Sequence, residues 1–169
     1  MYNKVMIKNS TLEEQIGELL TRYSLTLAIA ESCTGGLISH RVTNVAGSSV
    51  YYLGGITAYA NETKERLLYV GKQTLEVYGA VSRETILEMA RGVRQALGSD
   101  IGLSTSGIAG PGGGTPAKPV GLTWIGLSAT GIDQAWQHSW PGERLAVKEQ
   151  TAEAALRHLV GYLAGLKQG

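Results

Sequence analysis

Two hydroxyls, a thiol and two glycines stand together in the stretch Ser32-Cys33-Thr34-Gly35-Gly36. An apolar run precedes this stretch and a helix-like pattern follows it, so it is predicted to be a sharp turn between a strand and a helix. Glycine lets backbone approach a ligand closely, and the first N–H groups of a helix are unpaired and partly positive. Such a turn can hold a phosphate, a carboxylate or a developing oxyanion. Ser32 and Cys33 are therefore candidate nucleophiles, with oxyanion donors predicted from Thr34 to Gly36 or at Gly107.

A nucleophilic Ser32 needs a base, and the sequence offers one kind more readily than another. The three histidines are scattered along the chain, at His40, His138 and His158. A Ser-His-Asp triad therefore has poor support. A lysine with a lowered pKa can take the hydroxyl proton instead, and Lys64 with Tyr59 nearby is the available pair. The alternative interpretation of Ser32 is a helix N-cap, which serine also favours.

Cys33 is the rival nucleophile. A thiol at a helix N-terminus would have a lowered pKa and be reactive, whereas a lone cysteine is more often a small buried hydrophobe. A cysteine amidase is therefore a third hypothesis. This single cysteine excludes an internal disulfide. No group of His, Cys, Asp or Glu has metal-ligand spacing, so we expect neither a metal nor another cofactor.

A second glycine-rich segment, residues 106–114, directly follows another apolar strand pattern. It lacks the GxxxxGK[ST] sequence of ATP-binding loops. However, two such turns after two strands favour one crevice at the carboxyl ends of a sheet, suited to a phosphorylated small ligand. Arg144 follows Pro141-Gly142 at a helix start, where its guanidinium could clamp an anion. The predicted substrate-binding residues are Thr34, Gly35, Gly36, Ser106, Gly107, Gly110, Gly112 and Arg144.

The elements expected around these residues alternate between helices and strands. Ser10 and Glu13 are the predicted capping box of the first helix, and Ser82 is predicted to cap a later one. The expected helices cover residues 10 to about 22, 37–45, 62–69, 73–78, 82–97 and 141–166. The expected extended segments are residues 25–30, 48–60, 101–105, 120–129 and 135–140, with a turn at 131–133 and a long loop at 106–119. This order predicts one domain, an α/β sandwich with a mixed sheet.

Composition excludes several classes of function. The 169 residues are 43% hydrophobic and 17% charged, which is typical of a globular chain with a real core. The net charge of +1 gives no support for a broad basic face that binds nucleic acid. No apolar run reaches the length of a membrane helix, and residues 1–6 lack a signal-peptide core. We expect a cytoplasmic protein with no membrane or nucleic-acid partner.

Seven short motifs follow one another along the chain: AESCTGG at 30–36, AGSS at 46–49, YANETK at 59–64, GAVS at 79–82, SGIAGP at 106–111, KPVG at 118–121 and GER at 142–144. Together they resemble the C-terminal domain family of the competence-damage-inducible protein CinA, in its stand-alone bacterial form. The resemblance spans residues 10 to about 165. It implies a three-layer α/β/α sandwich with a mixed, mostly parallel sheet, as one domain over residues 1–169.

The resemblance also implies an activity, which is the hydrolysis of nicotinamide mononucleotide to nicotinic acid mononucleotide and ammonia in pyridine nucleotide salvage. In this family the serine matching Ser32 is regarded as the nucleophile, and the residues matching Tyr59 and Lys64 assist it. The arginine matching Arg144 is implicated at the site. No metal is required, and members form homo-oligomers. The second hypothesis is a non-catalytic nucleotide-binding or interaction module that retains the pocket.

The chain departs from the family pattern at four positions near these motifs. Ala60 and Thr63 stand where Ser and Ala are expected, Glu143 replaces an Asp, and Lys148 replaces an Arg. None of these changes removes a proposed catalytic group. The nucleotide- or molybdopterin-binding-like domain of longer family members has no counterpart in the sequence, so its functions are not expected here.

Overall fold

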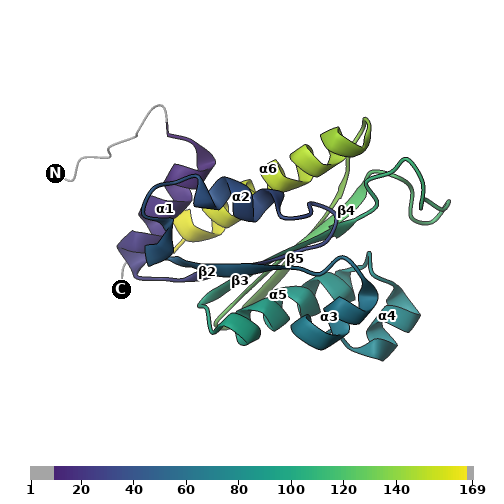
Figure 1. Ribbon diagram of the computed structural model, residues 1–169, viewed down its shortest axis with the longest axis horizontal. Coiled ribbons are helices and arrows are strands. Elements are labelled where there is room, and N and C mark those ends of the chain that lie inside the picture. Colours follow the sequence, from purple (N-terminus) through teal and green to yellow (C-terminus); the bar gives the residue numbers. More distant parts are fainter. Residues whose placement is uncertain (1–9, 167–169) are drawn as a thin grey trace.

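A five-stranded sheet lies at the centre of the computed structural model, which describes residues 10–166 (Figure 1). The strand order is β2-β1-β3-β4-β5. The strands are β1 (Leu27–Glu31), β2 (Tyr52–Thr57), β3 (Ile101–Gly107), β4 (Leu122–Ala129) and β5 (Ile132–Ser139). β1 pairs in parallel with β2 and β3, whereas the β3–β4 and β4–β5 pairs are antiparallel. Four strands therefore share one direction and β4 alone opposes them, which confirms the predicted mixed sheet.

Helices cover both faces of this sheet, as a three-layer sandwich requires (Figure 1). On one face lie α1 (Leu12–Tyr23), α2 (Leu37–Thr43) and α6 (Arg144–Ala164). On the other face lie α3 (Asn61–Leu68), α4 (Lys72–Tyr78) and α5 (Arg83–Leu97). A short 3-10 turn, η1 (Ser48–Val50), precedes β2. Within residues 10–166, no helix combines the length and apolar character needed to cross a bilayer. Residues 1–6, where the sequence predicts no signal-peptide core, lie outside the described part of the chain.

The fully buried strand β1 divides the core into two parts. Leu27 and Ile29 belong to the cluster packed under α1 and α6, whereas Ala28 and Ala30 belong to the cluster packed against α5. Successive side chains of a strand point to opposite faces of the sheet. The last residue of β1, Glu31, therefore faces the α2 layer, and the next side chain along the chain faces the α3 layer.

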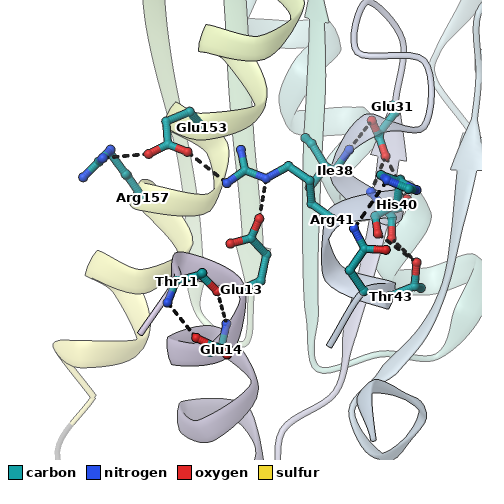
Figure 2. Close-up of polar contacts among 12 residues, drawn as sticks. Thr11, Glu13, Glu14, Glu31, Ile38, His40, Arg41, Thr43, Glu153 and Arg157 are labelled. Carbon is teal, nitrogen blue, oxygen red and sulfur yellow. Dashed lines mark hydrogen bonds and ion pairs between the residues drawn. The ribbon is translucent and has the colours of Figure 1, made fainter. Parts of the chain in front are cut away.

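The N-terminus of α1 corrects a prediction. Thr11, rather than Ser10, is the N-cap: its hydroxyl accepts the Glu14 N–H at 3.3 Å, and the Glu14 carboxylate accepts the Thr11 N–H at 2.8 Å (Figure 2). The carboxylate predicted for this role, Glu13, instead pairs with Arg41 of α2. Both cap sequences fit the same Ser/Thr-x-x-Glu pattern, and the ion pair to α2 decides between them.

Arg41 also joins α2 to α6, so three helices on one face of the sheet are linked through one guanidinium (Figure 2). Its Nη2 donates to the Glu153 carboxylate at 2.9 Å, and Arg157 donates to the same carboxylate at 2.6 Å. Arg41 is only 24% exposed in its side chain, which makes this pairing less screened than a surface ion pair. The network fixes α2, the helix that follows the Ser32 turn, against its neighbours.

Other element boundaries agree with the pattern or shift for local reasons. The Ser82 cap of α5 is confirmed, since its hydroxyl accepts the Thr85 N–H at 3.2 Å. The predicted turn at 131–133 is wrong: β5 begins at Ile132 because Gly131, at φ +74°, makes the hairpin turn shorter than expected. Residues 48–50 form η1 rather than a strand.

Two helix glycines give a matched test of packing. A Cβ at Gly92 of α5 would lie 1.8 Å from the carbonyl oxygen of Leu68 at the end of α3, whereas a Cβ at Gly161 of α6 would meet nothing within 4 Å. We expect Gly92→Ala to lower the free energy of unfolding by about 2 kcal/mol or more, because α3 must move away. Gly161→Ala should raise it by up to about 1 kcal/mol through helix propensity. Urea denaturation measures both, and equal stability of the two variants would contradict the close packing of α5 on α3.

Candidate active site

Ser32 follows β1 and meets Lys64, which α3 carries from the next layer. Lys64 Nζ lies 3.2 Å from Ser32 Oγ, 2.9 Å from the Ala58 carbonyl oxygen and 3.2 Å from the Tyr59 carbonyl oxygen. Lys64 is 1% exposed, and Ser32 is also buried. The structure therefore brings together the serine and the lysine that the sequence predicted as a pair, although they are far apart in the chain.

The surroundings of Lys64 favour its neutral form. Among residues 10–166 no carboxylate forms an ion pair with it. Burial lowers the pKa of Lys64, and the nearby Cys33 thiol opposes this only in part. A neutral amine has two N–H donors and one lone pair, so it can donate to both carbonyls and accept the Ser32 proton. The ammonium has three donors for the same three partners, and a proton can therefore pass from Ser32 to Lys64 without rearrangement.

The turn after β1 is held by a buried carboxylate that the sequence did not single out. Glu31 is 1% exposed. Its carboxylate accepts the Ile38 N–H at 3.1 Å (Figure 2). It also accepts the N–H groups of Gly36 at 3.1 Å and Ser39 at 2.8 Å. The first N–H groups of α2 are thus bound by Glu31, and the N-cap position falls at Gly36, with φ +98°. Ser32 is therefore not the N-cap of α2, which removes the alternative interpretation of its hydroxyl.

Three predicted substrate-binding residues are absent from the lining of the Ser32 cavity, among them Thr34, whose side chain turns to Glu31. Thr34, Gly35 and Gly36 line a neighbouring cavity of about 370 Å³ beside Lys148. The Gly36 N–H is bound to Glu31, and the Gly35 N–H donates to the Ser32 carbonyl at 3.1 Å. These two amides are therefore not available to an oxyanion at Ser32.

Two other amides of the same turn remain available. The N–H groups of Cys33 and Thr34 make no hydrogen bond to another residue within the described part of the chain. They come directly after Ser32 in the sequence, which is where backbone donors to an oxyanion commonly follow a nucleophile.

The remaining predicted residues surround one cavity of about 280 Å³. Ser32, Tyr59 and Lys64 line it, together with five of the eight predicted substrate-binding residues: Ser106, Gly107, Gly110, Gly112 and Arg144. Asn61, the first residue of α3, also lines it and was missed, although it stands inside the motif at 59–64. A larger hollow of about 930 Å³ beside α1 has no lysine, histidine or cysteine in its lining. Chemistry rather than size therefore places the candidate site at Ser32.

Tyr59 and Arg144 meet at the mouth of this cavity rather than at the nucleophile. Arg144 donates to the Tyr59 phenol oxygen at 2.7 Å and to the Gly110 carbonyl at 2.8 Å. The phenol is 61% exposed and makes no hydrogen bond to Ser32 or Lys64 within residues 10–166. Tyr59 contacts Lys64 through its backbone carbonyl, which accepts a hydrogen bond from Lys64 Nζ. A proton relay from Ser32 to Lys64 through the Tyr59 hydroxyl is therefore not formed in this geometry.

For Cys33, the structure favours the buried alternative over the reactive thiol. It is 5% exposed, and burial raises the pKa of its thiol to about 12. A thiolate is the nucleophilic form of cysteine, so this thiol is almost wholly unreactive at neutral pH. Its position just before α2 does not lower the pKa because the helix N-terminus faces Glu31.

The histidines lie away from the cavity, so a triad has no support in this geometry. His138 of β5 and His158 of α6 pair through their Nε2 atoms at 3.0 Å. His158 stacks on Trp136, and burial lowers its pKa to about 4. His40 lines the neighbouring cavity beside Gly36. Within residues 10–166, no three His, Cys, Asp or Glu side chains are grouped to hold a metal ion.

Comparison with known sequences places this site in a wider group. A family profile described as the CinA C-terminal domain matches residues 9–163. A protein of Moorella thermoacetica named as competence-damage inducible is 50% identical over 148 residues, covering 88% of this chain and 36% of that protein. A CinA-like protein of Salinibacter ruber is 49% identical over 146 residues, covering 86% of this chain and 35% of that protein. The chain therefore spans about a third of the length of these relatives.

Solved structures share the fold as well. A CinA superfamily protein of Klebsiella pneumoniae superposes with a TM-score of 0.87 at 30% identity, covering 93% of this chain and 100% of that one. A competence/damage inducible protein of Agrobacterium tumefaciens superposes with a TM-score of 0.84 at 35% identity, covering 92% of this chain and 97% of that one. The α/β architecture is therefore common to these proteins.

The buried thiol gives a prediction independent of any substrate. At pH 8, a pKa of about 12 leaves roughly one thiol in 10⁴ ionised. We expect Cys33 to react with a disulfide reagent such as DTNB at least about 100-fold more slowly in the folded protein than in urea. The absorbance of the released thiolate follows the reaction. Equal rates in both conditions would contradict the burial of Cys33.

Proposed function

This chain belongs to the CinA C-terminal domain family, and on that premise we propose that it is a serine amidase acting on nicotinamide mononucleotide. The reaction yields nicotinic acid mononucleotide and ammonia. The observation that carries the proposal is the contact of Ser32 Oγ with the buried, carboxylate-free Lys64 Nζ, at 3.2 Å. The identity of the substrate rests on the family resemblance in the sequence, and the size and charge of the cavity support it.

The first half of the reaction uses Lys64 as base and then as acid. Neutral Lys64 takes the Ser32 proton while Ser32 Oγ forms a bond to the carboxamide carbon. The amides of Cys33 and Thr34 stabilise the oxyanion, and each donor contributes on the order of 3 kcal/mol. The Lys64 ammonium then gives its proton to the leaving nitrogen, the C–N bond breaks, and ammonia departs. Ser32 is left as an ester of the nicotinate group, with Lys64 neutral again.

The second half repeats these steps with water. Lys64 accepts a proton from water as its oxygen attacks the ester carbon. When the bond to Ser32 Oγ breaks, Lys64 returns the proton to that oxygen and the carboxylic acid product leaves. One water is consumed and one ammonia is released, so the two halves balance. The two proton transfers between Lys64 and Ser32 Oγ use the 3.2 Å contact already present in the structure.

The substrate's phosphate needs donors away from Ser32, and Arg144 can supply them. A guanidinium has five N–H donors, of which two are engaged by Gly110 and Tyr59. No carboxylate pairs with Arg144 in the described part of the chain. Gly112 and Gly113 line the same cavity and leave room for backbone contact with an anion. We propose that Arg144 and this loop hold the 5′-phosphate.

The nucleophile is tested by ammonia release from nicotinamide mononucleotide with a chelator present. We expect Ser32→Ala to reduce kcat by at least about 10³-fold, since the covalent step is lost. Cys33→Ala, which keeps the backbone N–H, should stay within about threefold of wild type.

The opposite pattern, with activity lost in Cys33→Ala and kept in Ser32→Ala, would favour the cysteine amidase. If the folded wild-type protein releases no ammonia but binds the nucleotide in calorimetry, the non-catalytic module is favoured.

The base is tested by the pH profile. Because Lys64 acts in its neutral form and burial lowers its pKa, kcat/KM should rise with pH and level off above that lowered pKa. Lys64→Arg keeps the charge but cannot lose its proton, so we expect a loss of about 10²-fold to 10⁴-fold at every pH. Lys72→Arg, a change at a lysine whose side chain is 76% exposed, is the matched control and should leave the profile unchanged. If the pH profile of kcat/KM for Lys64→Arg equals that of wild type, Lys64 is not the base.

A further inference from the structure

We propose that Glu31 is a positioning residue for the reaction at Ser32. Its carboxylate never meets the substrate. It holds the turn that carries the nucleophile, so that Ser32 Oγ stays within hydrogen-bond distance of Lys64 Nζ. The inference rests on the proposed function, and it adds a residue to which neither the sequence motifs nor the cavity assign a role.

The contacts of Glu31 gather on one face of the sheet. Besides three N–H groups of the Gly36-to-Ser39 segment, its two oxygens accept the hydroxyls of Ser39 at 2.8 Å and Thr34 at 2.6 Å. Five donors converge on one carboxylate that is 1% exposed. Ionised carboxylates are acceptors only and take about four or more such bonds, so the site is built for the charged form.

A second chain of bonds ties the same turn to β3. The Thr34 hydroxyl, which donates to Glu31, lies 2.8 Å from the Thr105 hydroxyl. The Ser32 N–H donates to the Thr105 carbonyl at 2.9 Å. Ser32 is therefore fixed through its own amide by β3, and the residue two positions later is fixed by both β3 and Glu31.

Strand alternation connects these contacts to the nucleophile. Glu31 and Ser32 are adjacent, and they point to opposite faces of the sheet. A shift of the α2 N-terminus must move the backbone between them, and with it Ser32 Oγ on the far face. Misplacing a reacting group by about 1 Å costs on the order of 10²-fold in rate. Loss of the carboxylate is thus expected to lower kcat while the distant phosphate contacts, and hence substrate affinity, are kept.

The decisive variant is Glu31→Gln, which keeps the side-chain size but places an NH₂ donor against backbone N–H groups. Thr34→Val is a milder second variant that removes one hydroxyl link and stays informative if Glu31→Gln does not fold. Thr26→Val is the matched control: it removes a threonine hydroxyl that donates to Asp100 at 2.7 Å at the opposite end of β1. All three are compared with wild type for melting temperature, kcat, KM and the rate at which a fluorophosphonate reagent labels Ser32.

We expect Glu31→Gln to lose about 10²-fold in kcat and in Ser32 labelling, with KM within about threefold. Thr34→Val should lose about 10-fold in both, and Thr26→Val should change neither. A fall in melting temperature with kcat and labelling unchanged overturns the inference, as does an equal loss in Thr26→Val.

The labelling readout separates this inference from the proposed function. Wild type that labels at Ser32 but releases no ammonia from nicotinamide mononucleotide would defeat the proposed substrate, while the effect of Glu31→Gln on labelling still tests the positioning role. Wild type with neither labelling nor turnover would overturn both.

Discussion

Burying Lys64 without an acidic partner is the constraint on which the proposed chemistry depends. A buried ammonium is costly unless it is paired, and within residues 10–166 its hydrogen-bond partners are two carbonyls and one hydroxyl. Both carbonyls, from Ala58 and Tyr59, belong to the short connection between β2 and α3, and α3 itself supplies the lysine. One local segment therefore delivers the base together with the acceptors that keep it aimed at Ser32. Such an arrangement lowers stability relative to an apolar side chain, which is a cost that functional sites commonly carry.

The second constraint is that adjacent residues at the end of β1 act on opposite faces of the sheet. β1 ends where Glu31 turns toward α2 and Ser32 turns toward α3, so a single backbone segment couples the scaffold on one side to the chemistry on the other. On the scaffold side, Arg41 further ties α2 to α1 and α6. On the chemical side, α3 is packed against α5 so closely that Gly92 has no room for a Cβ. Both neighbours of the turn are thus held by packing that lies outside the cavity.

Patterns along the chain were sufficient for the mixed α/β architecture because the helix and strand periods and the glycine breaks are local signals. The pairing of Ser32 with Lys64 was also within reach, since the scattered histidines left Lys64, beside Tyr59 in the first turn of a predicted helix, as the available base. The first cap was missed by one residue because Ser10-x-x-Glu13 and Thr11-x-x-Glu14 overlap. Only the tertiary contact of Glu13 with Arg41 separates them.

The errors at the site share a different cause. The sequence left a reactive Cys33 open, and it offered Gly35 and Gly36 among the oxyanion donors. Both ideas assume that the N-terminus of α2 faces open space. Glu31 occupies that position, and a glutamate at the end of an apolar run carries no local sign of burial. The pKa of Cys33 then follows from desolvation, which depends on helices distant in sequence. Burial and long-range hydrogen bonding are the properties that a linear pattern does not contain.

The presence of Glu31 also limits where a substrate's negative charge can bind. The partial positive charge at the start of α2 is already neutralised by a full carboxylate, so a phosphate placed there would meet a like charge. An anionic substrate must find its donors elsewhere, and Arg144 is the arginine that lines the Ser32 cavity. Because Arg144 begins α6 while Ser32 directly follows β1, the phosphate and the reacting carboxamide would be held by different layers of the sandwich. Both anchors line one cavity, so under the proposed function the phosphate and the carboxamide must be bound within the same cavity.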